Sequence, residues 1–197
     1  KTPPVYRFEV ITAGSASPGD VLLLTNAEGG TVSDESGWSH SYTLVNMRAD
    51  TPGLYGSYAV WADSTGAGAS ATVNTTPSTV AFSLAEDFTA ECAVYVSAAH
   101  NGQVRLLYLG ADGDLVFEGR LDCNSDGTCD LELSFLTNPQ ELVGITLAYA
   151  TRNHVEITYE AATQTCRLYF NGSMMLSSTF VGTLPSYAYV SAMPPVE

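Results

Sequence analysis

Apolar residues occur along the chain in short runs separated by polar and turn-forming residues. The runs are rich in Val, Ile, Thr, Tyr and Phe, and Gly, Asn, Asp, Ser or Pro stand at their ends, which is typical of strands joined by tight turns. No segment shows the sustained helical period of a long amphipathic helix. We therefore predict an all-β chain with strands at residues 5–12, 21–25, 41–45, 55–62, 79–84, 88–97, 104–109, 115–121, 130–136, 154–159, 165–170, 174–180 and 187–192.

The alternation of apolar and polar residues is clearest in the second half of the chain. Val155, Ile157 and Tyr159 fall on one face of their predicted strand and polar residues fall on the other, so one face is expected to be buried. After the next alternating strand come Asn171 and Gly172. This pair readily adopts the positive φ values of a type I′ turn, so we predict a tight hairpin at this point.

The segment His154-Val-Glu-Ile-Thr-Tyr-Glu-Ala-Ala-Thr-Gln-Thr-Cys-Arg-Leu-Tyr-Phe-Asn-Gly172 resembles the most recognisable hairpin of laminin-G-like and concanavalin A-like domains. In that pattern one strand ends in Thr-Tyr and the next ends in Tyr-x-Asn-Gly. Upstream, Asp87-Phe-Thr-Ala-Glu-Cys-Ala-Val-Tyr-Val96 is similar to a family strand that opens with Phe-Thr. The resemblance covers residues 82–192 and implies an antiparallel two-sheet β-sandwich, or jelly roll. It also implies that the strand at 5–12 pairs beside the strand at 187–192.

We predict that residues 1–197 form a single β-sandwich domain. The segment 64–78 is rich in Gly, Ala, Ser and Thr, and we interpret it as an exposed loop, with a domain boundary as the alternative. Residues 1–12 begin with a Pro-Pro pair and continue with an alternating apolar face. We expect this terminal strand to pair within its own chain, and donation to the open edge of a neighbour is the alternative.

The charge balance limits the partners that the chain can have. It carries 21 acidic and 7 basic residues, for a formal net charge of −14, and no basic patch is evident. Nucleic acid would therefore be repelled, whereas cations would be attracted. No apolar run is long enough to cross a bilayer, so we expect no membrane insertion. The abundant Gly, Ser and Thr favour a secreted, extracellular or cell-surface location.

The four cysteines match no zinc-binding spacing and are interpreted as disulfides. Cys123 and Cys129 flank a predicted hairpin turn, and we expect them to pair. Cys92 and Cys166 both fall on inward faces of predicted strands, and we expect them to form the second disulfide. Buried free thiols at Cys92 and Cys166 are the alternative, which would suit a reducing compartment.

One loop has the ligand spacing of a calcium site. Oxygen-bearing side chains stand at alternate positions and are followed by a sharp-turn Gly, as in the first nine positions of an EF-hand loop. The twelfth position, which requires Glu in that motif, is Leu133. A calcium ion would be held by Asp122, Asn124, Asp126, Asp130 and the carbonyl of Thr128. The alternative is a polar hairpin turn closed by a disulfide.

The candidate ligand-binding residues form an aromatic cluster in a polar stretch. Trp38, His40 and Tyr42 could supply the ring platform that carbohydrate binding uses. In the loop at 64–78, Asn74 begins an Asn-Thr-Thr sequon and is a candidate glycosylation site.

No catalytic constellation stands out in the sequence. The run from Glu86 to Glu91 lacks the carboxylate spacing of glycan hydrolases on this fold, and its adjacent carboxylates point to opposite faces. We therefore predict that the chain is not an enzyme but a recognition or adhesion module that binds glycan or extracellular protein ligands. The alternative is a structural subunit of an extracellular filament or coat, in which copies of the chain contact one another through strands or sheet edges.

Overall fold

The computed structural model describes the backbone at residues 5–10, 23–26, 33–34, 41–45, 47–50, 59–62, 70–74, 81–95, 102–111, 114–124, 126, 128–136 and 141–190. Side chains are described at residues 83–91, 94, 103, 116–124, 126, 128–136 and 142–186. All secondary-structure elements in these ranges are strands, and every strand pair is antiparallel. The predicted all-β class is therefore confirmed.

The strands form two large sheets. The first sheet runs, in spatial order, β16 (Ser173–Thr179), β15 (Thr165–Phe170), β14 (Arg152–Glu160), β9 (Phe88–Tyr95), β1 (Val5–Val10), β2 (Leu23–Asn26) and β3 (Ser33–Asp34), with β6 (Ala59–Ala62) joining β1 to β5 (Met47–Asp50). The second sheet runs β13 (Glu141–Thr146), β12 (Thr128–Phe135), β11 (Asp114–Cys123), β10 (Gly102–Ala111), β17 (Tyr187–Val190) and β8 (Ala81–Ser83).

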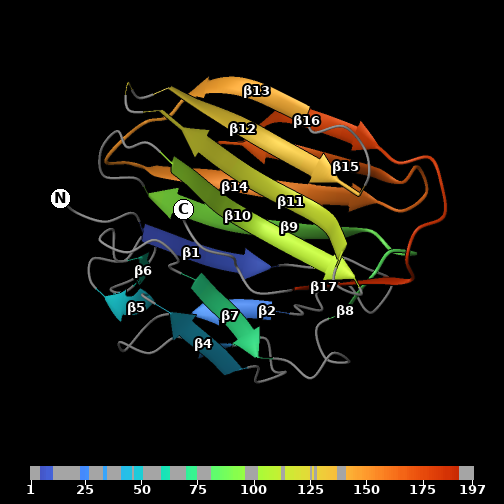
Figure 1. Cartoon of the computed structure of the whole chain (residues 1–197), viewed down its shortest axis with the longest axis horizontal. Helices are drawn as coiled ribbons and strands as arrows, with labels where there is room; N and C mark the ends of the chain where they lie inside the picture. The colour runs from blue at the N-terminus through green and yellow to red at the C-terminus, as the bar shows by residue number, and fades with distance from the viewer. Residues whose placement is uncertain are drawn as a thin grey trace.

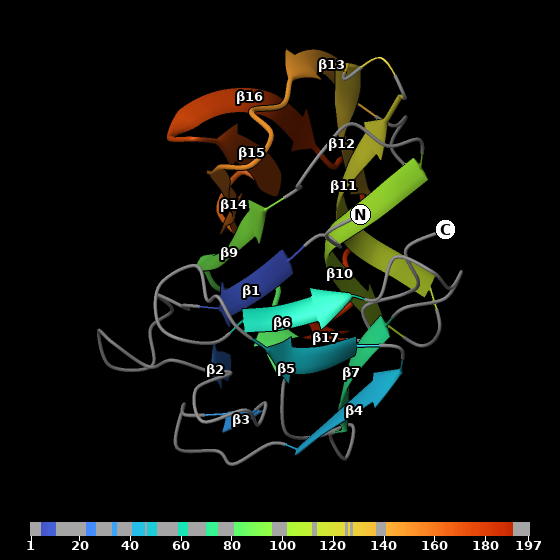
Figure 2. The same cartoon turned by 90° about the vertical axis from the view of Figure 1, so that its left-hand side faces the viewer.

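The two sheets lie as layers with their inner faces toward each other (Figure 1). Figure 2 shows β14, β15 and β9 in one layer and β10, β11 and β12 in the other. A separate two-stranded ribbon, β4 (Ser41–Val45) with β7 (Ser70–Asn74), lies at the end of the molecule near β5. The predicted two-sheet sandwich is therefore confirmed.

The core fills the space between the layers with the inward side chains of both sheets. At its centre Phe88, Phe117, Phe135 and Tyr159 pack ring against ring, with the centroids of Phe117 and Phe135 4.5 Å apart and those of Phe88 and Tyr159 5.2 Å apart. Each aromatic pair adds about 0.5–1.5 kcal/mol to the stabilisation from area burial. The hydroxyl of Tyr159 donates to the carbonyl of Leu84 over 3.0 Å, so its polar end is satisfied inside the core.

At Gly119 the two layers pack closely against each other. It lies on the inner face of β11, and a Cβ atom there would stand 2.8 Å from Cδ1 of Ile157 and 3.3 Å from Cδ1 of Leu168. Real Cβ atoms do not occur at the shorter of these distances, so a side chain at this position would force the facing residues to move. The absence of a side chain therefore lets β14 and β15 pack directly onto β11.

The hairpin between β15 and β16 has the predicted turn. Asn171 and Gly172 both have positive φ values, 49° and 80°, as the type I′ geometry requires. The Oδ1 atom of Asn171 accepts from the backbone N–H of His154 over 2.8 Å, and its Nδ2 atom donates to Oδ1 of Asn153 over 3.1 Å. Asn171 thus both shapes the turn and ties it to β14.

The terminal strand pairs with a different partner from the one that the resemblance implied. β1 pairs within its own chain with β9, through Val5 opposite Tyr95 and Glu9 opposite Glu91. The last described strand, β17, lies in the other sheet between β10 and β8, so the pairing of 5–12 with 187–192 is wrong. In this register Tyr6 lies opposite Val94 and Val5 opposite Tyr95, and Val94 is a buried core residue of β9.

The segment 64–78, predicted as an exposed loop, contains a strand. β7 occupies residues 70–74 and pairs with β4, with Tyr42 opposite Val73. Its alternation of small or β-branched residues with Ser and Thr is too weak to stand out from a loop until a partner strand supplies the backbone hydrogen bonds. The rest of that segment lies outside the described residues. The prediction also missed β3, β5 and β13, which are short and, in β13, interrupted by Gly144.

Replacing Gly119 with Val should destabilise the sandwich by about 1–3 kcal/mol, because the added methyl groups overpack the contact with Ile157 and Leu168. Gly144 is the matched control: it is exposed on β13, and a Cβ there would meet only Oδ1 of Asp130, at 3.7 Å. We expect Gly144→Ala to change stability by less than about 0.5 kcal/mol. Urea unfolding of the two variants checks this, and equal midpoints would contradict the close-approach argument.

Candidate functional site

A row of polar side chains covers the outer face of the first sheet. Strand alternation sends the apolar residues of β9, β14 and β15 into the core and the intervening residues outward. We call this surface the polar face, and its outward side chains are Thr89, Glu91, His154, Glu156, Thr158, Glu160, Arg167 and Tyr169. It is a surface rich in hydrogen-bonding groups on a rigid scaffold.

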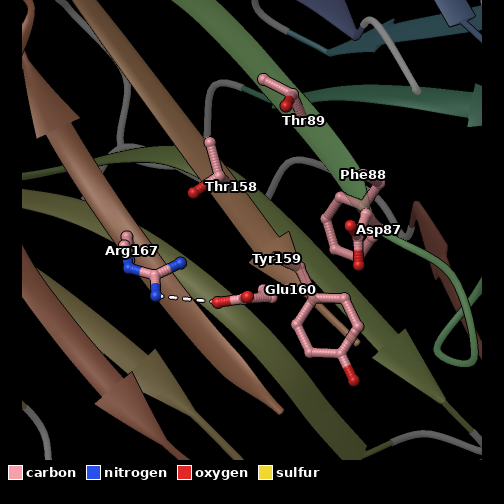
Figure 3. A pocket seen from close by; sticks show the side chains of 7 residues that line it. All are labelled: Asp87, Phe88, Thr89, Thr158, Tyr159, Glu160 and Arg167. Atoms are coloured by element: carbon pink, nitrogen blue, oxygen red, sulfur yellow. Dashed lines mark hydrogen bonds and ion pairs between the residues drawn. The ribbon is translucent and has the colours of Figure 1, made fainter. Parts of the chain in front are cut away.

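A cleft of about 500 Å³ opens at one end of the polar face (Figure 3). It lies where β9 begins and β14 ends, and its lining residues are Asp87, Phe88, Thr89, Thr158, Tyr159, Glu160 and Arg167. The register explains why they meet, because Thr158 lies directly opposite Thr89 on one side and opposite Arg167 on the other. These three side chains therefore form one row across three strands.

The two rings that line the cleft belong to the core. Phe88 is 4% exposed and Tyr159 is 2% exposed, so most of the surface that the cleft offers to a ligand comes from its other lining residues. Burial, with a smaller effect from the nearby Asp87 charge, raises the pKa of Tyr159 to about 12. Its hydroxyl consequently keeps its proton at neutral pH and serves the contact with Leu84, not chemistry in the cleft.

An ion pair spans the floor of the cleft. The Nη2 atom of Arg167 donates to Oε2 of Glu160 over 2.8 Å, and the hydroxyl of Thr163 donates to the same oxygen over 3.0 Å. The Arg167 and Thr163 hydrogen bonds lower the pKa of Glu160, and the same pairing raises the pKa of Arg167. Both groups are therefore charged throughout the neutral range.

Asp87 immediately precedes β9 and lines the cleft. Its Oδ1 atom accepts from the backbone N–H of Ala161 over 2.8 Å, which ties the start of β9 to the turn after β14. In the described part of the chain, Oδ2 of Asp87 and the hydroxyls of Thr89 and Thr158 make no hydrogen bond. These groups are available to a ligand.

A second charged cluster lies further along the polar face. Nε2 of His154 contacts Oε2 of Glu91 at 3.1 Å, and Glu156 lies directly opposite Glu91 on the neighbouring strand. Reasoning along single strands missed this pair of carboxylates, because it is assembled between strands that are far apart in the sequence. None of these three residues lines the cleft.

The loop predicted to hold calcium is a hydrogen-bonded turn in the structure. Oδ1 of Asp126 accepts from both the backbone N–H and the hydroxyl of Thr128, over 2.9 and 2.7 Å. Nδ2 of Asn124 donates to the Thr128 hydroxyl, and Oδ2 of Asp122 accepts from Gln103.

Asp130 lies opposite Asp122 on the ladder. Among the side chains that the structure describes, no three His, Cys, Asp or Glu residues are grouped so as to hold a metal ion. Calcium binding stays a prediction.

One of the two expected disulfides is present. Cys123 and Cys129 lie directly opposite each other on β11 and β12, with their Cα atoms 4.1 Å apart, and they are bonded. The Cys92–Cys166 pairing is wrong, because Cys166 is a buried free thiol.

The sheet register explains the error. Cys92 lies opposite Val155, whereas Cys166 lies opposite Tyr159, so the two cysteines are on different sides of β14 and four residues out of step. Two strand spacings and four residues separate their Cα atoms by roughly 16 Å. This is more than twice the 7 Å limit for a disulfide. The prediction that both cysteines face inward therefore did not mean that they are close.

The aromatic platform predicted from the sequence is largely outside the described residues. Trp38 and His40 are not described, and Tyr42 is described only as a backbone position in β4. The candidate glycosylation residue Asn74 ends β7, opposite Ser41, and its side chain is likewise not described. These residues stay predictions, and the cleft on the polar face is a site that the sequence reasoning did not identify.

Comparison with known proteins gives a fold but no sequence family. No protein-family model matches the sequence, and no curated protein matches it. The chain is similar to the solved structure of the receptor-binding domain of botulinum neurotoxin D, with a TM-score of 0.52 and 11% identity over 84% of this chain and 46% of that one.

Two further structures show the same likeness. A mutant of HCR/D has a TM-score of 0.53 and 11% identity over 89% of this chain and 43% of that one. A structure of botulinum neurotoxin type C has a TM-score of 0.52 and 8% identity over 89% of this chain and 42% of that one. The cell entry of that toxin is described as dependent upon interaction with two ganglioside molecules. The chain spans less than half the length of these structures. It has the β-sandwich fold of the concanavalin A-like kind, as the sequence resemblance implied.

Reduction of the Cys123–Cys129 disulfide should lower stability by roughly 2 kcal/mol, because the bond limits the freedom of the unfolded hairpin. For a chain of this size, that loss corresponds to a melting temperature about 4–8 °C lower. Calorimetry with and without reductant checks this. A double Cys123→Ala/Cys129→Ala variant should melt at the same temperature in both buffers, and sensitivity of this variant to reductant would contradict the assignment.

Asp126→Ala should lower the melting temperature at pH 7 in chelator, because the contacts with Thr128 are lost whether or not an ion is present. These contacts hold the pKa of Asp126 below its ordinary value of 3.8. Their contribution is present above that value and is lost as pH falls through the lower folded-state pKa. The difference from the unaltered chain should therefore shrink in acid. A larger loss in calcium buffer than in chelator would support the calcium prediction, and equal losses would contradict it.

Proposed function

We propose that the chain is a non-catalytic recognition module that binds a glycan in the cleft at the end of the polar face. The observation that carries this proposal is the row formed by Thr89, Thr158 and Arg167, with Asp87 and Glu160 beside it. It combines hydroxyl, carboxylate and guanidinium groups on three rigid strands. Binding sites built on strands hold their groups more accurately than sites built on loops.

The hydrogen-bonding groups of the cleft suit the hydroxyls of a sugar. A sugar hydroxyl both donates and accepts, and the cleft offers acceptors at Asp87 and groups of both kinds at Thr89 and Thr158. Because these groups already project from the sheet, little ordering is needed when a ligand arrives. Tyr169, half-buried on the same face two residues from Arg167, provides a described ring outside the core.

Known proteins of similar fold supply independent support. One of the structures reported above is a receptor-binding domain, and another is described by the interaction of its toxin with gangliosides, which are glycolipids. The identity is too low to transfer residues. We transfer only the class of activity, which is binding of an external ligand without chemical conversion.

The charges in the cleft argue against glycoside hydrolysis. A hydrolase needs a carboxyl group whose pKa is raised so that it can donate a proton. Glu160 has the opposite property, because Arg167 and Thr163 lower its pKa. The facing carboxylates of Glu91 and Glu156 lie outside the cleft, and Glu91 is already paired with His154.

The same proposal places the chain in an extracellular or cell-surface setting, where disulfides such as Cys123–Cys129 persist. An extracellular protein that carries the glycan is a fitting partner. The alternative of a filament subunit was based mainly on donation of the terminal strand to a neighbouring copy. This argument is weaker because β1 pairs with β9 in its own chain.

Thr158→Val should weaken glycan binding about tenfold, because it removes one hydrogen-bonding group and leaves a sugar hydroxyl unpaired. The substitution keeps a β-branched residue in the strand, so the fold should be preserved. Thr146→Val is the matched control, since Thr146 is an exposed strand residue on β13 of the other sheet. A glycan array followed by calorimetry with the best glycan checks this. Equal affinities of the two variants would contradict binding in the cleft.

A further inference from the structure

We propose, on the basis of the glycan-binding function above, that the ligand of the cleft is an uncharged glycan and that glycans bearing carboxylate or sulfate groups are rejected. The observation that carries this inference is that the cleft holds two carboxylates, Asp87 and Glu160, and one guanidinium, Arg167, which is already paired with Glu160. The cleft therefore has an excess of negative charge before any ligand enters.

Arg167, the cation that lines the cleft, already forms an ion pair with Glu160. Arg167 donates through Nη2 to Glu160 over 2.8 Å, and the two residues project from neighbouring strands toward each other (Figure 3). Recognition of a ligand carboxylate commonly uses a two-pronged contact with an arginine. In this cleft, such a contact would compete with Glu160 and leave that carboxylate beside the ligand carboxylate.

No other cation of the described polar face compensates. His154 contacts Glu91 at 3.1 Å, and Glu156 stands opposite Glu91. Arg152, at the start of β14, is six residues from Thr158, which corresponds to roughly 20 Å along a strand. At this distance its charge is largely screened at physiological salt. An anionic glycan in the cleft would therefore lie near the carboxylates of Asp87 and Glu160.

The hydrogen-bond inventory leads to the same conclusion. Asp87 is exposed, and its Oδ2 atom makes no hydrogen bond in the described part of the chain, so it can accept a hydrogen bond from a ligand donor. Sugar hydroxyls are donors, whereas carboxylate and sulfate oxygens are acceptors only. The formal charge of the whole chain, −14, acts in the same direction during the approach of the ligand.

The test uses an array that presents each neutral glycan beside its sialylated and sulfated counterparts, with the intact chain as the probe. We expect every glycan that binds to be neutral and to exceed its charged counterpart by at least about tenfold, the order expected for like charges in contact at a surface. Affinity for the neutral glycan should be nearly unchanged between about 0.05 and 0.5 M NaCl, because no net charge is exchanged.

Glu160→Gln isolates the proposed cause. It removes one carboxylate and releases Arg167, so the preference for the neutral glycan should fall severalfold, mainly through tighter binding of the charged counterpart. Glu156→Gln is the matched control on the same face outside the cleft, and it should alter the preference less. Melting curves of both variants establish that they are folded.

The outcomes separate the two proposals. Preferred binding of sialylated or sulfated glycans by the unaltered chain would overturn the charge inference and leave glycan recognition standing. An unchanged preference in folded Glu160→Gln would also overturn the inference. The absence of binding to every glycan would overturn both proposals.

Discussion

The register of β14 between β9 and β15 is the constraint on which both the core and the cleft depend. With Tyr159 opposite Phe88 and Cys166, the odd-numbered residues of β14 point inward and the even-numbered ones point outward. A slip by one residue would place the polar side chains in the core and the apolar ones on the surface, so burial of one face determines the other. The same pairing that brings Ile157 against Gly119 also aligns Thr158 with Thr89 and Arg167.

Local sequence patterns predicted the hairpin well because its information is local. The alternation in β14 and β15 and the turn at Asn171 and Gly172 involve neighbours in the chain, and the two strands occupy the predicted positions with small changes at their ends. The same holds for Cys123 and Cys129, which flank one short turn and lie opposite each other.

Contacts between distant segments were the part that sequence could not supply. Strand alternation predicts that Cys92 and Cys166 both face inward, yet the residues of β14 that lie opposite them are four positions apart, and nothing in either segment specifies that offset. The cleft is hidden for the same reason, because Thr89 and Thr158 are unremarkable strand residues until the pairing of β9 with β14 places them side by side. The candidate site is therefore a product of register.

Two of the arginines whose side chains the structure describes form ion pairs with carboxylates. Arg120 pairs with Glu132, Arg167 with Glu160, and His154 contacts Glu91. Exposed pairs of this kind contribute little to folding energy, but they position charged groups. Glu132 is different because it is almost fully buried on β12. There burial raises the pKa of its carboxyl despite the contact with Arg120, so ionising it opposes folding as pH rises through the acid range.

The buried thiol of Cys166 has a consequence for measuring motion in this protein. The side chain is fully enclosed between the layers, and this burial raises the pKa of the thiol, so the folded form offers neither access nor thiolate to a reagent. Each reaction at this sulfur must therefore follow a transient separation of β15 from the facing sheet. The rate at which a thiol reagent labels the peptide containing Cys166 therefore measures how often the sandwich opens locally, and no residue has to be introduced for the measurement.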